Sequence, residues 1–292
     1  MGGKAASLAR LAAAGAPVPD FFVVTTRAFE HHLSHNGLDW PASDDPDPIE
    51  ELAGRIARAP MPGVIHESIS NACRALMRAG VQPAVAVRSS GAAEDSGPAS
   101  FAGQFATVLG VSGGDVERAV CRCWASSLSK GSLAYRRSRG IPLGAGPSFA
   151  VVVQTQVIAD KAGVLFTRHP LEPAGDSAYL EANFGTGESV VGGMVTPDSI
   201  SVSRSTGRVA GSRIGSKKRM TVVSENEQGS RVIVTDPGLR GAAVLSNTEA
   251  ELVVELGLRI EERMGQPQDI EWAFDGSGLW ILQARPQTGL PG

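Results

Sequence analysis

The apolar residues of this chain fall into short continuous runs that alternate with helical patterns. Continuous runs of this length are typical of strands buried on both faces, whereas apolar residues three and four positions apart indicate helices. The runs predict strands at 21–24, 84–87, 106–111, 149–159 and 162–166. The helical patterns cover residues 4–14, 27–36, 49–58, 64–79, 115–138 and 247–264. The acidic, Pro-rich stretch 37–48 is expected to be a surface loop, and Thr25 or Thr26 could cap the helix at 27–36.

Glycine and polar clusters divide the second half of the chain into hairpins. A turn at Asp160-Lys161 predicts that the runs 149–159 and 162–166 pair with each other. Residues 178–204 alternate short strands with a Gly-rich turn, and 205–235 suggest further hairpins. The runs DIEWAFD and LWILQAR, separated by Gly276-Ser277-Gly278, form a closing hairpin. Such a mixture of hairpins and helices indicates an α+β fold rather than a regular βαβ sheet.

Composition narrows the class of protein. The 292 residues include 42% hydrophobic ones, which suffices for a core, and the formal net charge of −3 shows no basic excess of the kind that nucleic-acid binders carry. No apolar run approaches the roughly 18 residues of a membrane span, and no signal peptide is evident. Three cysteines without a CxxC spacing indicate a reducing, cytoplasmic location without disulfides. We therefore expect no nucleic-acid or membrane partner.

Two cationic residues are candidates for binding an anion. Lys4 follows two glycines and precedes a helix, so backbone N–H groups and an ammonium group would face the same ligand. The P-loop spacing is absent, and a surface lysine is the alternative. Arg88 ends an apolar run beside Ser89 and Ser90, which suits a phosphate group, although pairing with a nearby carboxylate would also explain it.

Two Gly-rich segments could lie over phosphates. Residues 96–104 are small and polar around Phe101, and would serve either as a phosphate-covering loop or as a loop without a ligand. The segment NFGTGES, at 183–189, has the spacing GxGxS rather than GxGxxG and lacks a βαβ context. A dinucleotide fingerprint is therefore rejected.

The closing hairpin carries a third group of polar residues. Gln283 and Arg285 are two positions apart and so share a face, and Glu271 lies on the partner strand. A carboxylate, an amide oxygen and a guanidinium on one face suit Mg²⁺ and a polyphosphate, because Mg²⁺ is usually held by one or two protein oxygens plus phosphates and water. The alternative is a buried salt bridge between Glu271 and Arg285.

The histidines and cysteines give weaker signals. His31 and His35 share a helical face that could bind a metal, but the Pro/Asp-rich loop beside them favours a solvated face. Cys121 and Cys123 are expected to be packing residues.

Taken together, these segments resemble a known family. The blocks follow one another in the order GGKAASLARL, VAVRSSGAAEDSGPASFAGQFATVLGV, VVVQTQV, AGVLFTRHP, NFGTGESVVGGMVTPD and QDIEWAFDGSGLWILQARPQT. This order resembles the N-terminal nucleotide-binding domain shared by phosphoenolpyruvate synthases, pyruvate phosphate dikinases and rifampin phosphotransferases. The resemblance runs from residue 2 to about residue 288, nearly the whole chain.

The resemblance implies an ATP-grasp-like fold with ATP between two lobes, which we expect at 1–153 and 154–292. Enzymes of this family cleave ATP to AMP and phosphate, and pass one phosphoryl group to a histidine on a separate swivelling domain. A third domain then transfers it to pyruvate or another acceptor. Positive charges and Mg²⁺ would stabilise the charge that develops on the transferred group.

The family's functional residues can be matched one by one. Lys4, Arg88 and Arg285 match catalytic, phosphate-binding cations, and Glu271 and Gln283 match the pair on the metal and ribose side. Gln154 matches a residue near the adenine. The loop that covers the phosphates corresponds to Gly103, Gln104 and Thr107.

The chain departs from the family pattern in three places. It ends just after LQARPQT, so the phosphohistidine and acceptor domains would reside on a separate partner protein that acts on a small-molecule acceptor. It begins at the GGK block, where relatives carry a further short stretch. FTRHP places His169 where relatives often carry Asp, which makes His169 a minor candidate phosphoacceptor.

Two alternatives remain open. One is a self-sufficient ATP-grasp kinase or ligase that forms ADP, and the other is a nucleotide-binding subunit without catalysis.

Overall fold

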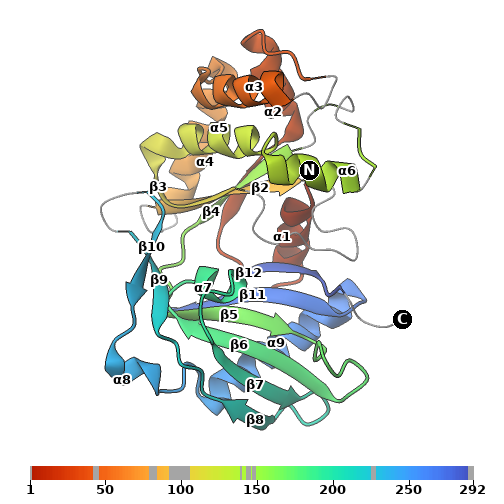
Figure 1. The fold of residues 1–292 in the computed structure, drawn as a ribbon, viewed down its shortest axis with the longest axis vertical. Coiled ribbons are helices and arrows are strands. Elements are labelled where there is room, and N and C mark those ends of the chain that lie inside the picture. Colours follow the sequence, from red (N-terminus) through yellow and green to blue (C-terminus); the bar gives the residue numbers. More distant parts are fainter. Residues whose placement is uncertain are drawn as a thin grey trace.

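The computed structural model describes residues 2–41, 46–78, 84–91, 106–138, 140–142, 146, 149–224 and 228–288. The described chain forms two main antiparallel sheets, one above the other in Figure 1, with helices on the outer side of each, and a third sheet of two strands. The α+β fold predicted from the sequence is confirmed. The predicted loop residues Gly103 and Gln104 lie outside the described residues.

The small sheet has the strand order β1-β4-β2-β3. Its strands are β1 (Phe21–Val24), β2 (Ala84–Gly91), β3 (Thr107–Ser112) and β4 (Phe149–Thr155). Helices on its outer side are α2 (Thr26–His35), α3 (Pro46–Arg58), α4 (Gly63–Arg78), α5 (Val116–Ser126) and α6 (Lys130–Ser138), with the short 3₁₀ turn Gly113–Asp115 before α5. The predicted loop at 37–48 is therefore shorter than expected, because α3 begins at Pro46. Thr25 occupies the N-cap position of α2, but its side chain makes no capping hydrogen bond.

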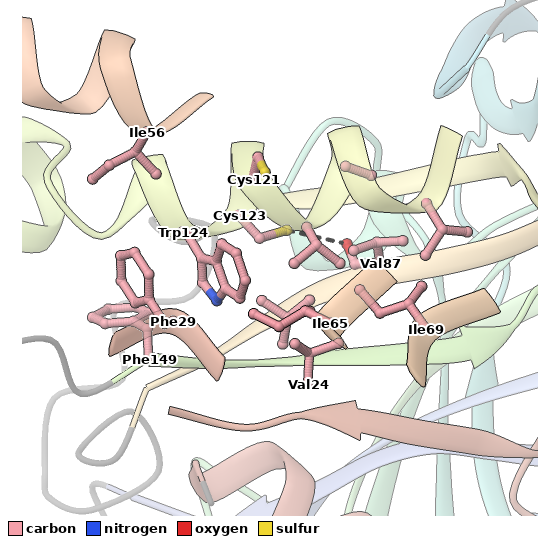
Figure 2. Close-up of a cluster of buried hydrophobic side chains, with 14 of the residues drawn as sticks. Val24, Phe29, Ile56, Ile65, Ile69, Val87, Cys121, Cys123, Trp124 and Phe149 are labelled. Atoms are coloured by element: carbon pink, nitrogen blue, oxygen red, sulfur yellow. Dashed lines mark hydrogen bonds between the residues drawn. The ribbon is translucent and has the colours of Figure 1, made fainter. Parts of the chain in front are cut away.

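Both faces of the small sheet are buried, which explains the continuous apolar runs of its strands. Val151 and Val153 of β4 belong to a cluster with the outer helices, whereas Val152 between them belongs to the core of the other sheet. Figure 2 shows part of the outer cluster, in which Phe29 of α2 stacks on Trp124 of α5 with ring centroids 4.9 Å apart. Such stacking stabilises the core in addition to the stabilisation that comes from burying the two rings.

The large sheet has the strand order β12-β11-β5-β6-β7-β8. Its strands are β5 (Lys161–Phe166), β6 (Ser177–Phe184), β7 (Asp198–Ser203), β8 (Val209–Arg213), β11 (Gln268–Asp275) and β12 (Gly278–Pro286). A separate two-stranded sheet is formed by β9 (Arg219–Val223) and β10 (Ser230–Val234). The short helices α7 (Glu188–Val191) and α8 (Pro237–Arg240) lie in connections.

Two helices pack against the large sheet. Helix α9 (Asn247–Met264) begins with a Ser246 capping box and ends at Gly265, whose φ of 74° is the left-handed conformation that glycine adopts without strain. Helix α1 (Gly3–Ala13) lies between the sheets, and its Leu8 and Leu11 belong to the core cluster of the large sheet.

Two predictions about the elements are wrong. The runs 149–159 and 162–166 do not pair, because β4 joins the small sheet and β5 joins β6 and β11 in the large one. The helical pattern 115–138 divides into α5 and α6, since the hydroxyls of Ser126 and Ser127 hydrogen-bond the carbonyls of Cys123 and Trp124 at the end of α5. The closing hairpin, β11 with β12, is confirmed. The expected lobe boundary at 153/154 falls within β4 and stays a prediction.

Candidate functional site

A pocket of about 430 Å³ lies between the two sheets. Its walls come from β2 and β3 of the small sheet, from β11 and β12 of the large sheet, and from the start of α1. The connection from β4 to β5 forms a further part of the wall, since Gln156, Val157 and Ala159 also line the pocket. A cavity with contributions from separate elements, mixed apolar and polar, is typical of a small-molecule site.

The residues predicted from the sequence converge on this pocket. Those that the structure describes all line it, namely Lys4, Arg88, Thr107, Gln154, Glu271, Gln283 and Arg285. They come from six elements, which extend from α1 at the start of the chain to β12 near its end. The order of these residues in the sequence does not show that they are neighbours. The fold brings them together.

Arg88 connects the two sheets at the centre of the pocket. Its Nη2 donates to Glu271 Oε2 and to Gln283 Oε1, at 2.9 Å each, and its Nη1 donates to the Leu282 carbonyl at 2.9 Å. The side chain is only 12% exposed. Arg88 lies within β2, which runs on to Gly91, rather than at a strand end. Both interpretations of Arg88 thus find support, because it lines the pocket and also pairs with a carboxylate.

The register of the closing hairpin places four polar residues on one face. Glu271 is opposite Gln283, and Asp269 is opposite Arg285. The register shifts between Glu271 and Trp272, directly after the polar pair. Bulges of this kind are frequent beside functional sites because they redirect the side chains next to them.

The proposed salt bridge between Glu271 and Arg285 is wrong. Arg285 instead donates from Nε and Nη2 to Asp269 Oδ2, at 2.9 and 2.6 Å. Burial raises the pKa of the Asp269 carboxyl, the Arg285 guanidinium lowers it, and the nearby Glu271 raises it further. Asp269 was missed by the sequence analysis. Its position two residues before Glu271, on the same strand face, was the available signal.

Lys4 is held at the pocket by the contact between α1 and β2. The Ala5 amide donates to Ser90 Oγ at 3.1 Å, and Lys4 Nζ donates to the Ser89 carbonyl at 3.3 Å. Gly2 precedes the helix, and a Cβ there would stand 1.9 Å from the Ser90 carbonyl oxygen. Only glycine allows the first turn of α1 to approach β2 so closely.

The Gly-rich segment NFGTGES forms the opposite wall. Its Thr186, Gly187 and Glu188 line the pocket, and Glu188 Oε2 is buried without a hydrogen-bond partner in the part of the chain that the structure describes. The neighbouring strands β6 and β7 are antiparallel, so the rejection of a dinucleotide fingerprint is confirmed. Thr186, Glu188 and Gln156 are pocket residues that the sequence analysis did not select.

The donor set of the pocket fits Mg²⁺ together with a ligand that supplies further oxygens. Glu271 Oε2 and Gln283 Oε1 converge on one atom of Arg88, so two protein oxygens lie within reach of a single point. Among the described residues there is no group of three His, Cys, Asp or Glu side chains arranged to hold a metal by itself. Mg²⁺ commonly binds through one or two carboxylate or amide oxygens plus phosphates and water.

The remaining candidates lie outside the pocket. His169 packs against the Tyr179 ring at 4.7 Å and accepts a hydrogen bond from the Leu171 amide, and it is not among the lining residues. The rings of His31 and His35 lie 6.1 Å apart on exposed positions of α2. The three cysteines are buried, as expected of packing residues. Within the described residues, no helix combines the length and the apolar character that crossing a membrane requires.

Comparison with known proteins gives one consistent family. The family model described as "Pyruvate phosphate dikinase, AMP/ATP-binding domain" matches residues 1–291. The chain is 39% identical to a probable phosphoenolpyruvate synthase of Archaeoglobus fulgidus, over 99% of this chain and 40% of the relative. It is 37% identical to the rifampicin phosphotransferase of Streptomyces sviceus, over 99% of this chain and 34% of the relative.

The match with a probable phosphoenolpyruvate synthase of Methanocaldococcus jannaschii covers 99% of this chain and 25% of the relative, at 36% identity. The chain thus spans about a quarter to two fifths of these relatives. Among solved structures, an L-amino acid ligase from Bacillus licheniformis aligns with 99% of this chain and 43% of the other, at 9% identity and a TM-score of 0.41.

Proposed function

Because the chain belongs to the pyruvate phosphate dikinase AMP/ATP-binding domain family, we propose that it binds Mg·ATP between its two sheets and prepares a phosphoryl group for transfer. The observation that carries the proposal is the convergence of Arg88, Glu271 and Gln283 in one pocket. Lys4 and Arg285 line the same pocket and add two further cationic groups. A cluster of cations beside cation-binding oxygens is what a polyphosphate with its metal ion requires.

The lining of the pocket combines apolar and charged residues, and this mixture matches the two parts of a nucleotide. Apolar residues of both sheets, among them Ala86, Leu109 and Leu282, line it together with Val157 and Ala159 of the connection. These surfaces, with Gln154, would take the adenine. The charged residues would take the phosphates, and Thr107 would join the phosphate side together with Gly103 and Gln104. Bound Mg²⁺ would neutralise phosphate charge, with Glu271 and Gln283 as its protein ligands.

The proposed reaction consumes ATP and water and yields AMP, phosphate and a phosphorylated histidine. The histidine belongs to a partner, either a separate chain or a further domain, that passes the phosphoryl group to a small-molecule acceptor. In this chain Lys4, Arg88 and Arg285 would stabilise the negative charge on the phosphoryl group that is transferred. The separation of the acceptor from the nucleotide pocket is consistent with relatives of which this chain covers only 25% to 40%.

The test is a nucleotide-product assay. The pure chain is incubated with Mg·ATP, and AMP, ADP and phosphate are separated by chromatography. The assay is repeated with the remaining part of a full-length relative, expressed without its own ATP-binding part. We expect Mg·ATP binding with slow turnover by the chain alone and AMP formation with the partner. ADP that increases with an added small acceptor would instead identify a self-sufficient kinase or ligase.

Two variants make the assay specific for the pocket. Glu271→Gln removes the carboxylate charge without changing the shape of the side chain, and we expect it to weaken Mg·ATP binding measured by isothermal titration. Glu255→Gln is the matched control, because Glu255 lies on α9 with 68% of its side chain exposed.

Tight ATP binding by the wild type, without turnover in the presence of any partner, would favour a non-catalytic subunit.

A further inference from the structure

The β9–β10 hairpin stands outside both main sheets and contacts both sides of the pocket. In Figure 1 it extends along the edge of the molecule, from the large sheet up to β3 of the small sheet. Its own pairing runs from Arg219 opposite Val234 to Val223 opposite Ser230. None of the hairpin residues that the structure describes lines the pocket itself. An effect of the hairpin on the site must therefore pass through the walls that it contacts.

The lower contact joins β9 to the Gly-rich wall. The Thr186 amide donates to the Thr221 carbonyl at 2.7 Å, and Asn183 Nδ2 donates to the Arg219 carbonyl at 3.0 Å. A Cβ at Gly185 would stand 2.2 Å from the Thr221 oxygen, and Gly185 has a φ of +74°. The glycine thus permits backbone to lie against backbone at this position. Since Thr186 lines the pocket, this end of the hairpin is fixed to one pocket wall.

The upper contact joins the other end of the hairpin to the opposite wall. The Gly229 amide donates to the Leu109 carbonyl at 2.7 Å, and Leu109 lines the pocket. Next to it, Gly110 lies so close to the hairpin that a Cβ there would be 3.0 Å from Val223 Cγ1. The Gly110 amide donates to Gln156 Oε1 at 3.3 Å, and Gln156 belongs to the connection between the sheets. The hairpin, β3 and the connection therefore meet at Gly110.

The base of the hairpin is fixed by a buried ion pair. Lys217, fully buried and with a φ of 36°, pairs with Asp198 at the start of β7. Asp198 also accepts hydrogen bonds from the amides of Gly215 and Val244, at 2.7 and 2.8 Å. Breaking such a pair by removing one partner leaves a buried charge uncompensated, so the base is held firmly. Among the described residues, the contacts with β3 are fewer and more exposed than this anchor.

We propose that the β9–β10 hairpin is a strap that sets the separation of the two pocket walls and couples that separation to ligand binding. The large sheet holds the base of the strap, and the contact at Leu109 and Gly110 holds β3 near the Gly-rich wall. Coupling of this kind is reciprocal: a ligand that binds the closer walls more tightly must also stabilise the strap contact. The choice of Mg·ATP as the ligand rests on the proposed function, whereas the strap itself rests on these contacts.

The experiment shortens the strap while keeping its base. Thr221 is opposite Val232 in the register, so replacing residues 222–231 by Asn-Gly leaves a two-residue hairpin turn and retains the Thr186–Thr221 hydrogen bond. The variant loses every strap contact to Leu109 and Gly110. We expect Mg·ATP affinity measured by isothermal titration to fall about five- to tenfold, a typical allosteric coupling. Val234→Ser is the control, because Val234 is 69% exposed on the same hairpin.

Hydrogen exchange supplies a readout that does not depend on nucleotide binding. Without ligand, the amides of residues 107–112 should exchange faster in the shortened variant than in the wild type and in Val234→Ser. With Mg·ATP, these amides and those of 228–234 should become protected in the wild type. Equal affinity and equal exchange of 107–112 in both proteins would overturn the strap.

The outcomes separate the two proposals. If the wild type binds no nucleotide, the proposed function is contradicted. The strap is then tested separately, by comparing the ligand-free hydrogen exchange of residues 107–112 between the wild type and the shortened variant. If the shortened variant does not fold, Val223→Asp tests the same contact with the hairpin intact, by placing a charge against Gly110. Unchanged exchange at 107–112 in Val223→Asp would also contradict the strap.

Discussion

Arg88 and Glu271 form an ion pair of 2.9 Å that joins β2 of the small sheet to β11 of the large one. The same guanidinium nitrogen also donates to Gln283, so Arg88 occupies the point on which the two candidate metal-binding oxygens converge. The guanidinium of Arg88 donates hydrogen bonds to both of these oxygens. A nucleotide that brings Mg²⁺ would compete with Arg88 for them and would offer its phosphates to the guanidinium in exchange.

Replacing Arg88 by alanine should therefore affect stability as well as binding. Glu271 Oε2 and the Leu282 carbonyl would lose their donor in a partly buried site, which costs about 1–3 kcal/mol in the free energy of unfolding. Urea unfolding measures this change. Arg118→Ala is the control, because that side chain is 65% exposed and its ion pair should contribute under about 1 kcal/mol. Equal stability of the two variants would contradict the bridging role of Arg88.

The closing hairpin shows where sequence patterns suffice. Its turn is short and its strands are adjacent, so their antiparallel pairing follows from local geometry. The register shift between Glu271 and Trp272, which places Glu271 opposite Gln283, does not follow from the turn. Partner choice over longer distances does not follow. β4 and β5 are separated by only a few residues, yet both are continuous apolar runs, and such runs show that a strand is buried without showing in which sheet.

The same limit applies to the site. The candidate cations and oxygens could be selected by residue type and by resemblance, and the described ones do line one pocket. The sequence could not show which carboxylate pairs with Arg285, because Asp269 and Glu271 lie on the same strand face. In the structure, Arg285 pairs with Asp269. The Gly-rich pattern marked the segment 183–189 as a possible phosphate cover but did not single out Thr186 or Glu188, because their place on the pocket wall depends on the neighbouring antiparallel strands.

His32 should make the stability of the chain depend on pH. It is fully buried against Trp124, and burial lowers its pKa, opposed by the Ile56 backbone and assisted by the nearby His35. The unfolded chain then binds a proton more readily than the native one, so stability is greatest above about pH 6.5 and falls as the pH drops below that value.

The measurement for His32 compares urea unfolding of the wild type and His32→Phe between pH 5 and pH 8. The stability of the wild type relative to the variant should decrease as the pH falls below about 6.5, while carboxylates common to both proteins cancel. A difference that stays constant across this range would contradict the prediction.

The cysteines should be inert in the native protein. Burial, assisted by Glu117, raises the pKa of Cys121 to about 12, and burial does the same for Cys123. Burial also raises the pKa of Cys73. Because the thiolate is the reactive form, a chromogenic disulfide reagent at pH 8 should titrate no thiol in the native state and all 3 in guanidinium. Rapid reaction of one thiol before unfolding would show that a cysteine is accessible.

Gly257 sets how closely α9 approaches the large sheet. A Cβ at this position would stand 2.2 Å from Leu165 Cδ2, and Leu165 is fully buried in β5, so it has little room to move. Overpacking of this kind costs about 1–3 kcal/mol, so Gly257→Ala should lower stability although alanine is the better helix former. Leu165→Val removes the atom that clashes, at a cost of its own. In a double-mutant cycle measured by urea unfolding, Gly257→Ala should cost less in the Leu165→Val background than in the wild type. Additive costs would mean that the helix shifts away from the sheet without contacting Leu165, and that the close approach is not what requires glycine.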